Sequence, residues 1–400
     1  MLKAISSFSS IYFLCLFILL STLVKAEQVI HPVNMPKIVG YYPAWEAERG
    51  YTVKDMVERG AADKLTHLLF AFAGVNEQGQ CYIADPQASM KKAYNSHESL
   101  DGVADNEDAP VKGVIGQFVR LKKQYPDLKI LWSVGGWGLS PGFVEAAKNI
   151  EAFADSCFNM IYDPRWNGVF DGIDIDWEYP NACGVVCDHS GRDGYYKLMK
   201  AVRTRFGNDA LVTTAIGAQS TVLNAVDYGK AAPFIDFYMP MTYDFSGTWE
   251  AQGPVYPHSP LFAVEGADPT RNSDHAIKTL LSQNVPADKI LLGIGFYGRG
   301  WQGVKNESVL SIATAPAQGK NEVGAENYNT LIARCSNIDE ITGTAYSFCN
   351  NEWWSFDTPK TISIKMDYVN ERQLGGAFFW QLSGDTKTND LLNAIHQGLN

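Results

Sequence analysis

Four acidic residues lie close together between Phe170 and Pro180, and their spacing is the strongest chemical signal in the chain. Asp174, Asp176 and Glu178 alternate with apolar residues. Because successive side chains of a β-strand point to opposite faces, the three carboxyl groups would share one face of a strand. Buried carboxylates so close together cannot all ionise easily, so at least one should keep its proton near neutral pH. A protonated carboxylic acid beside a charged one is what cleavage of a glycosidic bond requires.

Two other interpretations of this acidic stretch are a calcium site and a solvated edge strand. The isoleucines and the tryptophan that alternate with the acids favour a buried strand over both. Asp171 has the opposite parity to the other three acids, so we expect it to have a structural role.

Eight apolar runs bounded by turn residues predict β-strands. They cover residues 38–42, 68–73, 130–134, 172–177, 211–216, 234–241, 290–296 and 376–381. Amphipathic stretches between them predict helices, most clearly at 113–124, 143–161, 195–205, 273–282, 361–369 and 389–398. This alternation predicts an α/β fold, a closed (β/α)8 TIM barrel. An open doubly wound sheet is the alternative, but no Gly-x-Gly-x-x-Gly turn follows the first strand.

Two connections are too long for a plain barrel. Residues 76–111 follow the second strand and are polar, with several acids. Residues 299–357 follow the seventh strand and contain Trp301, Tyr328, Tyr346, Trp353 and Trp354. A floppy loop would not need so many aromatic side chains, so we expect a small second lobe over the mouth of the barrel.

Unusual residues gather at the ends of the predicted strands, where the active sites of such barrels lie. The candidate binding residues are Tyr42, Phe72, Gly135, Gly136, Trp137, Tyr179, Met241, Asp244, Trp249, Arg299 and Trp380. Aromatic side chains at a rim stack well against sugar faces, although any single one is more often part of a core. The two glycines allow a ligand or backbone to come close, and a tight turn would also explain them.

Three motifs carry a family resemblance. Asp171…Asp174-x-Asp176-x-Glu178, Ser133-x-Gly135-Gly136 and Met241-x-Tyr243-Asp244 resemble the core motifs of the family 18 glycoside hydrolases, the retaining chitinases. The resemblance runs from about Lys37 to the C-terminus. It implies a catalytic barrel within residues 27–400, in which residues 299–357 resemble the α+β insertion of the deep-cleft members. The segments 243–249 and 297–301 are more similar to the bacterial and fungal branches than to the mammalian one.

The resemblance also implies roles. Glu178 would be the general acid and then the base, and the substrate's own 2-acetamido group would be the nucleophile. Asp176 would stabilise the positive intermediate and share a proton with Asp174, while Tyr243 would hold the acetamide oxygen. Asp244 would orient the sugar. Trp380 would form the floor under the reacting sugar, with Trp137 and Trp249 at product-side sugars.

The implied substrates are chitin and chitooligosaccharides, with no metal and no cofactor. Two alternatives stay open: an endo-β-N-acetylglucosaminidase acting on N-glycans, and a chitin-binding lectin. The presence of Glu178 disfavours the lectin, since non-catalytic members have usually lost this acid. The long aromatic insertion favours a cleft for a linear polymer over the glycan-cleaving alternative.

Residues 1–26 are predicted to be a signal peptide, because an apolar run at 11–20 is followed by Val24-Lys25-Ala26, a plausible cleavage site. The run is short for a membrane span, although a retained anchor is the alternative. We therefore expect a secreted, extracellular protein and a monomer. The formal net charge is −11, and loss of the two lysines of the signal would leave −13. Such a charge disfavours nucleic acid and anionic membranes as partners.

Six of the seven cysteines follow the predicted signal peptide, and an even number in an exported chain indicates disulfides. Their spacing suggests the local pairs Cys183–Cys187 and Cys335–Cys349, but about 15 complete pairings stay open. Cys183 and Cys187 next to His189 also hint at zinc, which the export signal disfavours. Asn306 is the one acceptor for an N-linked glycan after the signal.

Overall fold

The structure, a computed structural model, describes residues 35–305, 308–320 and 322–400. The predicted signal peptide and the predicted glycan acceptor Asn306 lie outside these residues. Within the described ranges, no helix combines the length and the apolar character needed to cross a bilayer.

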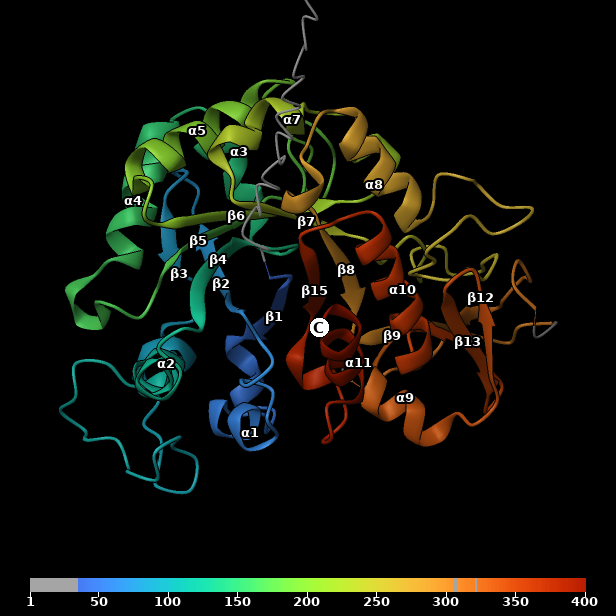
Figure 1. The fold of residues 1–400 in the computed structure, drawn as a ribbon, viewed down its shortest axis with the longest axis horizontal. Coiled ribbons are helices and arrows are strands. Elements are labelled where there is room, and N and C mark those ends of the chain that lie inside the picture. Colours follow the sequence, from blue (N-terminus) through green and yellow to red (C-terminus); the bar gives the residue numbers. More distant parts are fainter. Residues whose placement is uncertain (1–34, 306–307, 321) are drawn as a thin grey trace, which may run out of the picture. The chain divides into compact units, whose positions relative to one another are not determined.

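Eight parallel strands form a barrel around which the helices are arranged (Figure 1). The strands are β1 (Lys37–Pro43), β2 (His67–Val75), β4 (Lys129–Gly135), β5 (Gly172–Asp176), β6 (Leu211–Gly217), β7 (Phe237–Met241), β8 (Leu291–Gly295) and β15 (Gly376–Trp380). Their order is β7-β6-β5-β4-β2-β1-β15-β8, and a parallel bridge between Tyr238 and Ile290 joins the two ends. The predicted (β/α)8 barrel is therefore confirmed, and the open doubly wound sheet is excluded.

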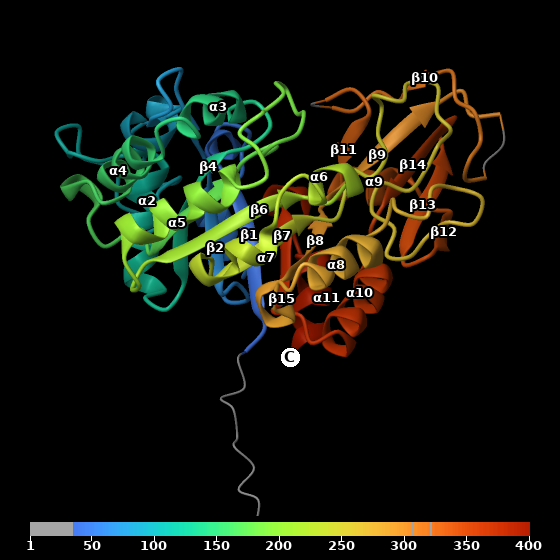
Figure 2. The same ribbon diagram turned by 90° about the horizontal axis from the view of Figure 1, so that it is seen from above.

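Helices cover the outside of the barrel (Figure 2). They are α1 (Val53–Glu58), α2 (Gly113–Gln124), α3 (Phe143–Ala146), α4 (Ile150–Ile161), α5 (Gly194–Phe206), α6 (Ser220–Leu223), α7 (Tyr228–Ala231), α8 (Ser273–Ser282), α10 (Pro359–Glu371) and α11 (Asp390–Leu399). The single helix expected over 143–161 is wrong. The chain breaks there into α3 and α4, because the Asn149 side chain accepts a hydrogen bond from the Ala152 N–H and so starts a new helix.

Side chains of alternate parity along the strands build two separate cores. The larger lies between the strands and the helices and includes Tyr42, Ile173 and Ile175. The smaller fills the barrel interior and includes Tyr41 and Phe378. The residues that face inward at the carboxyl ends of the strands form the floor of the candidate site.

The insertion after β8 folds as a small α+β lobe, as expected (Figure 2). Its elements are β9 (Tyr297–Gln302), β10 (Ala315–Pro316), β11 (Ala325–Asn327), α9 (Tyr328–Arg334), β12 (Ile338–Ile341), β13 (Thr344–Cys349) and β14 (Glu352–Phe356). The strand order is β10-β9-β14-β13-β12, with β11 paired to β9. Trp301, Trp353 and Trp354 are fully buried: the first two belong to a small separate core and Trp354 to the main core, so none of them forms a sugar-binding surface.

Three disulfides are present: Cys81–Cys157, Cys183–Cys187 and Cys335–Cys349. The two local pairs suggested by spacing are among them, and the zinc alternative at Cys183 and Cys187 is excluded by their bond. Cys81 lies in β3 (Cys81–Ile83), which pairs with β2, and its disulfide fixes the long polar connection to α4.

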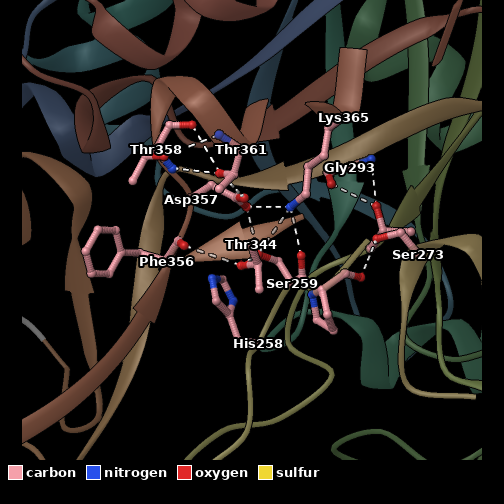
Figure 3. A network of polar contacts seen from close by, with 12 residues as sticks. His258, Ser259, Ser273, Gly293, Thr344, Phe356, Asp357, Thr358, Thr361 and Lys365 are labelled. Atoms are coloured by element: carbon pink, nitrogen blue, oxygen red, sulfur yellow. Dashed lines mark hydrogen bonds and ion pairs between the residues drawn. The ribbon is translucent and has the colours of Figure 1, made fainter. Parts of the chain in front are cut away.

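A buried ion pair fastens the lobe to the barrel (Figure 3). Lys365 of α10 donates to the Asp357 carboxylate at 2.6 Å and to the Ser259 carbonyl at 2.8 Å. Asp357 also accepts from the Ser259 hydroxyl at 2.7 Å and from the Thr361 hydroxyl at 2.8 Å. These residues come from the end of the lobe, from α10 and from the segment between β7 and α8, so the network joins three parts of the chain.

Candidate active site

The acidic residues of β5 lie at the centre of the barrel's carboxyl end. Asp174 and Asp176 are buried on the inner face, whereas Ile173 and Ile175 pack against the helices. Glu178 follows two residues after Asp176 and lines a cleft together with it. The alternation seen in the sequence is therefore present in the fold, and the segment is a buried strand, not a solvated edge strand.

Asp174 lies below the cleft and is held by three hydroxyl groups. Tyr41 donates to it at 3.0 Å, Ser133 at 2.7 Å and Thr213 at 2.7 Å. Complete burial raises the pKa of Asp174, and these hydrogen bonds oppose the rise. Asp174 does not line the cleft, so a role in the reaction would have to pass through Asp176.

Asp176 is only 4% exposed and lines the cleft. Its Oδ1 has no hydrogen-bond partner within the part of the chain that the structure describes. Burial raises the pKa of Asp176 well above its ordinary value, and the charges of Glu178 and Asp174 raise it further. A buried carboxyl with a free oxygen beside a cleft is ready to receive a polar or positive group.

Glu178 has the properties of a general acid. Burial raises the pKa of Glu178 to about 7; a hydrogen bond with Tyr179 opposes the rise and the charge of Asp244 adds to it. An acid with a pKa near the working pH both holds and releases a proton readily. The main chain is fixed as well, because the Glu178 N–H donates to the Ser140 hydroxyl at 2.9 Å.

Asp244 and Arg299 form an ion pair in the lining of the same cleft. The Arg299 guanidinium donates to both carboxylate oxygens of Asp244 at 2.8 Å. Burial raises the pKa of Asp244, but the charge and hydrogen bonds of Arg299 outweigh burial and hold the pKa below its usual range. Asp244 therefore stays ionised. Burial also raises the pKa of the neighbouring Tyr243, so its hydroxyl remains a hydrogen-bond donor.

These groups open into a cleft of about 1070 Å³. The predicted binding residues that line it are Phe72, Gly135, Gly136, Trp137, Tyr179, Met241, Asp244, Trp249, Arg299 and Trp380. Phe72 stacks on Trp380 with ring centroids 5.5 Å apart, which makes an aromatic floor. Trp137 and Trp249 stand at the rim with 56% and 60% of their surface exposed, so both present free ring faces.

Gly135 and Gly136 are required by the backbone. Their φ angles are 115° and 79°, and an ideal Cβ at Gly135 would lie 2.1 Å from the Asp176 carbonyl oxygen. At Gly136 it would lie 2.7 Å from the Phe72 ring. The glycines therefore allow two parts of the chain itself to come close. The tight-turn interpretation accounts for both of them, although both border the cleft.

The prediction that Tyr42 binds substrate is wrong. Its side chain is fully buried outside the barrel, beside Phe118 of α2, and its hydroxyl donates to the Tyr51 carbonyl at 2.8 Å. The preceding residue, Tyr41, lines the cleft instead. The alternation of β1 would have revealed this, since Tyr41 shares its parity with Val39 of the barrel interior.

Asp171 lies away from the cleft, as its opposite parity predicts. It forms an ion pair with Lys122 at 2.7 Å and accepts a hydrogen bond from the Ile130 N–H at 2.8 Å. It therefore fixes the start of β5 relative to α2 and β4, which is a structural role.

Sequence reasoning missed several cleft residues. Trp45, Tyr297 and Gln381 line the cleft in addition to Tyr41. Trp45 and Tyr297 follow strand ends, which is the signal that could have identified them. The lobe contributes Glu322 and the residues of β11 to one wall.

A second wall comes from the segment between β7 and α8. Phe245, Thr248, Trp249, Asp268, Thr270 and Arg271 of this segment line the cleft. An ion pair of 2.9 Å between Arg271 and Glu250 joins the two ends of the segment. Of this wall only Trp249 was predicted, since the other residues are spread over a loop without periodicity. Within the described residues, no group of three or more His, Cys, Asp or Glu side chains is placed to hold a metal ion.

Comparison with known proteins identifies close relatives of this chain. The sequence profile of glycosyl hydrolases family 18 matches residues 37–385. The chain is 49% identical over 358 residues to chitinase C of Streptomyces lividans, covering 88% of this chain and 58% of that protein. It is 47% identical over 367 residues to chitinase 63 of Streptomyces plicatus, covering 90% and 60% respectively. The chain thus spans less than two thirds of the length of these relatives.

The fold has a close counterpart among solved structures. The catalytic domain of the psychrophilic chitinase B from Arthrobacter TAD20 superposes with a TM-score of 0.85. The two chains are 27% identical, and the superposition covers 92% of this chain and 95% of the other. The barrel, with its lobe after β8, is therefore an architecture that an independently solved structure shares.

Proposed function

The chain belongs to the glycosyl hydrolases of family 18, and from this membership we propose that it is a chitinase that cleaves the β-1,4 bonds between N-acetylglucosamine units. The observation that carries the proposal is Glu178. It is a partly buried acid with a pKa of about 7 that lines an aromatic cleft together with Asp176, whose pKa is also raised, and Asp244, which stays ionised.

In the proposed first step, Glu178 donates its proton to the glycosidic oxygen as the bond from that oxygen to C1 breaks. The carbonyl oxygen of the substrate's own 2-acetamido group attacks C1 from the opposite side, which gives a cyclic oxazolinium ion and a free sugar hydroxyl on the leaving group. Tyr243 donates a hydrogen bond to the acetamide oxygen and so fixes it for attack.

The oxazolinium ion then gives Asp176 a positive neighbour, which it lacks in the free protein. The positive oxazolinium lies beside its carboxyl, and the acetamide N–H gives the free Oδ1 a donor. The ionised form of Asp176 is stabilised by this positive charge, so Asp176 gives up its proton toward Asp174. In the second step Glu178 takes a proton from water, and the water oxygen attacks C1 and opens the ring with overall retention.

The walls of the cleft support a linear polymer as the substrate. Trp137 and Trp249 present exposed rings at the rim of the cleft, and Phe72 and Trp380 stack on each other in its lining. Sugar rings offer apolar faces that match such surfaces. A neutral polymer also suits a chain of strongly negative charge.

Secretion is part of the proposal. The apolar run near the N-terminus followed by small residues is typical of a signal peptide, and three disulfides fit an oxidising compartment. The proposed mature protein is a monomer that begins after residue 26.

The test compares the wild type with Glu178→Gln on chitin oligomers, colloidal chitin and a high-mannose glycoprotein. We expect the wild type to cleave the first two and to leave the glycoprotein intact. The variant should lose at least about a hundredfold in kcat while still binding oligomers, because the amide keeps the shape and loses the proton. Cleavage of the glycoprotein with chitin untouched would establish the glycan-cleaving alternative.

Proton NMR of the first products tests the mechanism separately. Two successive inversions at C1 predict the β-anomer as the initial product. An initial α-anomer would mean direct attack by water and would exclude the acetamide as nucleophile.

A further inference from the structure

A small hairpin closed by the Cys183–Cys187 disulfide follows directly after Glu178. The Gly184 N–H donates to the Val186 carbonyl at 3.0 Å, and the Asp188 N–H donates to the Ala182 carbonyl at 2.9 Å. The hairpin, residues 182–188, is therefore a short closed ring of chain with its own hydrogen bonds.

Asp188 anchors the base of this hairpin. Its carboxylate is buried and accepts from the Asn181 N–H at 2.6 Å and from the Ser190 hydroxyl at 2.6 Å. The Asn181 amide in turn donates to the Ala225 carbonyl at 2.9 Å, in the segment after α6. The base is thus tied to the barrel, and the orientation of the ring above it depends on the disulfide.

The hairpin packs directly on the main chain of Glu178. An ideal Cβ on Gly184 would lie 2.3 Å from the Glu178 carbonyl oxygen and 3.4 Å from the Tyr179 nitrogen. On the other side of the same residue, the Glu178 N–H donates to Ser140. The backbone of Glu178 is therefore held between Ser140 and the hairpin, so a movement of Gly184 would release one side of it.

The disulfide that closes this hairpin is the most accessible of the three. Cys183 and Cys187 are both exposed, whereas Cys157 and Cys335 are buried and their partners Cys81 and Cys349 are partly covered. A reductant in solution therefore reaches the Cys183–Cys187 bond first. Opening such a short loop returns little chain entropy to the unfolded state, so the barrel should remain folded without the disulfide.

We propose that the Cys183–Cys187 disulfide is a positioning element for Glu178, and that its reduction lowers the catalytic rate of the folded enzyme. The proposal rests on the proposed role of Glu178. When the S–S bond is replaced by two S–H bonds, Gly184 is no longer held close against the Glu178 carbonyl. The side chain of Glu178 then loses its fixed place, and water reaches the carboxyl.

The main experiment compares Cys183→Ser/Cys187→Ser with Cys335→Ser/Cys349→Ser, a matched control in which a disulfide of the lobe is removed. On a soluble chitin oligomer, the first variant should lose about tenfold or more in kcat with little change in KM, because small displacements of a catalytic group are costly. The control variant should keep its kcat. A kcat within twofold of the wild type in the first variant would overturn the proposal.

Chemical reduction of the wild type also compares the enzyme with and without the Cys183–Cys187 disulfide, but without a substitution. Tris(2-carboxyethyl)phosphine converts the disulfide to two thiols and becomes its phosphine oxide, with the oxygen taken from water. We expect kcat of the wild type to fall on reduction and to recover on reoxidation, while Cys183→Ser/Cys187→Ser does not respond. An equal response of both proteins would place the sensitivity in another disulfide.

Gly184→Ala tests the packing against Glu178 with the disulfide intact; if the double variant fails to fold, reduction of the folded wild type decides the question. The Cβ added by Gly184→Ala must displace the Glu178 carbonyl, so kcat should fall as in the double variant. Gly191→Ala is the control, because Gly191 has a φ of 81° but no atom within 4 Å of its Cβ position. A larger loss of kcat in the control would mean that general strain in the loop, and not contact with Glu178, is responsible.

A measurement without substrate separates this inference from the proposed function. Carbon-13 NMR of the carboxyl groups, with the Glu178 signal assigned by its loss in Glu178→Gln, follows the titration of Glu178 directly. Access of water in Cys183→Ser/Cys187→Ser should lower the pKa of Glu178 from about 7 toward its ordinary value of 4.5. An unchanged pKa would overturn the positioning role even if the enzyme acted on another substrate.

Discussion

Two clusters of buried charge show how differently the same fold treats ionisable groups. In the Lys365–Asp357 network the charges are opposite, both side chains are fully buried, and hydroxyl or carbonyl groups fill the remaining positions (Figure 3). In the acidic ladder of β5 the charges are alike, and one oxygen of Asp176 has no partner among the described residues. The first cluster is an ion pair with every polar group bonded, whereas the second holds acidic groups alone and leaves one oxygen of Asp176 without a partner among the described residues.

The difference separates a structural role from a reactive one. A buried ion pair with complete hydrogen bonding holds its parts in a single arrangement, and removing one partner leaves a buried charge without compensation. Carboxyl groups without a cation keep their protons to unusually high pH and await a partner from outside. The network of Lys365 joins lobe to barrel, whereas the ladder is completed only when a ligand supplies a positive group.

The largest effect on stability should come from Lys365→Met. It leaves the Asp357 carboxylate buried and uncompensated, which typically costs about 3–5 kcal/mol of unfolding free energy. Lys365→Met/Asp357→Asn removes both charges and should recover part of this loss. Urea unfolding of the three proteins measures both values. If the single variant loses less than about 1 kcal/mol, the network does not anchor the lobe.

Asp176→Asn should have the opposite profile, with a loss of activity and no loss of stability. The amide cannot carry the charge that stabilises the proposed oxazolinium, so kcat should fall by about a hundredfold or more. Removing one of several crowded carboxyl groups should leave the free energy of unfolding unchanged or higher. Kinetics on a chitin oligomer and urea unfolding of the same preparation check the two halves. A variant that is active but less stable would reverse the roles assigned to the two clusters.

The ladder should also make the protein sensitive to pH in a defined direction. The pKa of Glu178 is raised from 4.5 to about 7 in the folded protein, so the folded state holds its proton more tightly than the unfolded state. Stability from this group is therefore present below pH 4.5 and is lost as the pH rises through about 7. The activity should fall over the upper part of the same range, because the acid must be protonated.

Glu178→Gln is the control for this pH dependence, since it cannot titrate. The difference in melting temperature between wild type and variant should change between pH 5 and pH 8, with the variant gaining relative to the wild type as the pH rises. A constant difference would show that Glu178 titrates near its ordinary pKa.

The smallest effects should come from two adjacent tyrosines of β1. Tyr41→Phe removes a hydrogen bond to Asp174. It should lower kcat by about tenfold, because a tenfold change in rate corresponds to about the free energy of one hydrogen bond. Tyr42→Phe removes a hydrogen bond to the Tyr51 carbonyl outside the barrel and should cost about 1 kcal/mol of stability with kcat unchanged. If Tyr41→Phe and Tyr42→Phe changed kcat equally, the position of a tyrosine inside or outside the barrel would not determine whether it affects catalysis.

The local features of this protein could be predicted from its sequence. Apolar runs, turn residues and amphipathic stretches predicted the barrel strands and most helices. These elements can be read from the sequence because buried side chains recur every second residue in a strand and every three to four residues in a helix. The parity of Asp174, Asp176 and Glu178 placed the acids on one face for the same reason. Parity also assigned Asp171 its structural place, but it was not applied to Tyr41 and Tyr42, where it would have avoided the error.

The distant residues that complete the site became known only from the folded chain. The hydroxyls of Tyr41 and Thr213 reach Asp174 from other strands, and Arg299 reaches Asp244 across 55 positions of sequence. The second wall between β7 and α8, the disulfide Cys81–Cys157 and the contact of Gly184 with Glu178 have the same origin. Such contacts produce no periodic pattern of residue types in the sequence, because they depend on how the closed barrel brings the ends of its strands together.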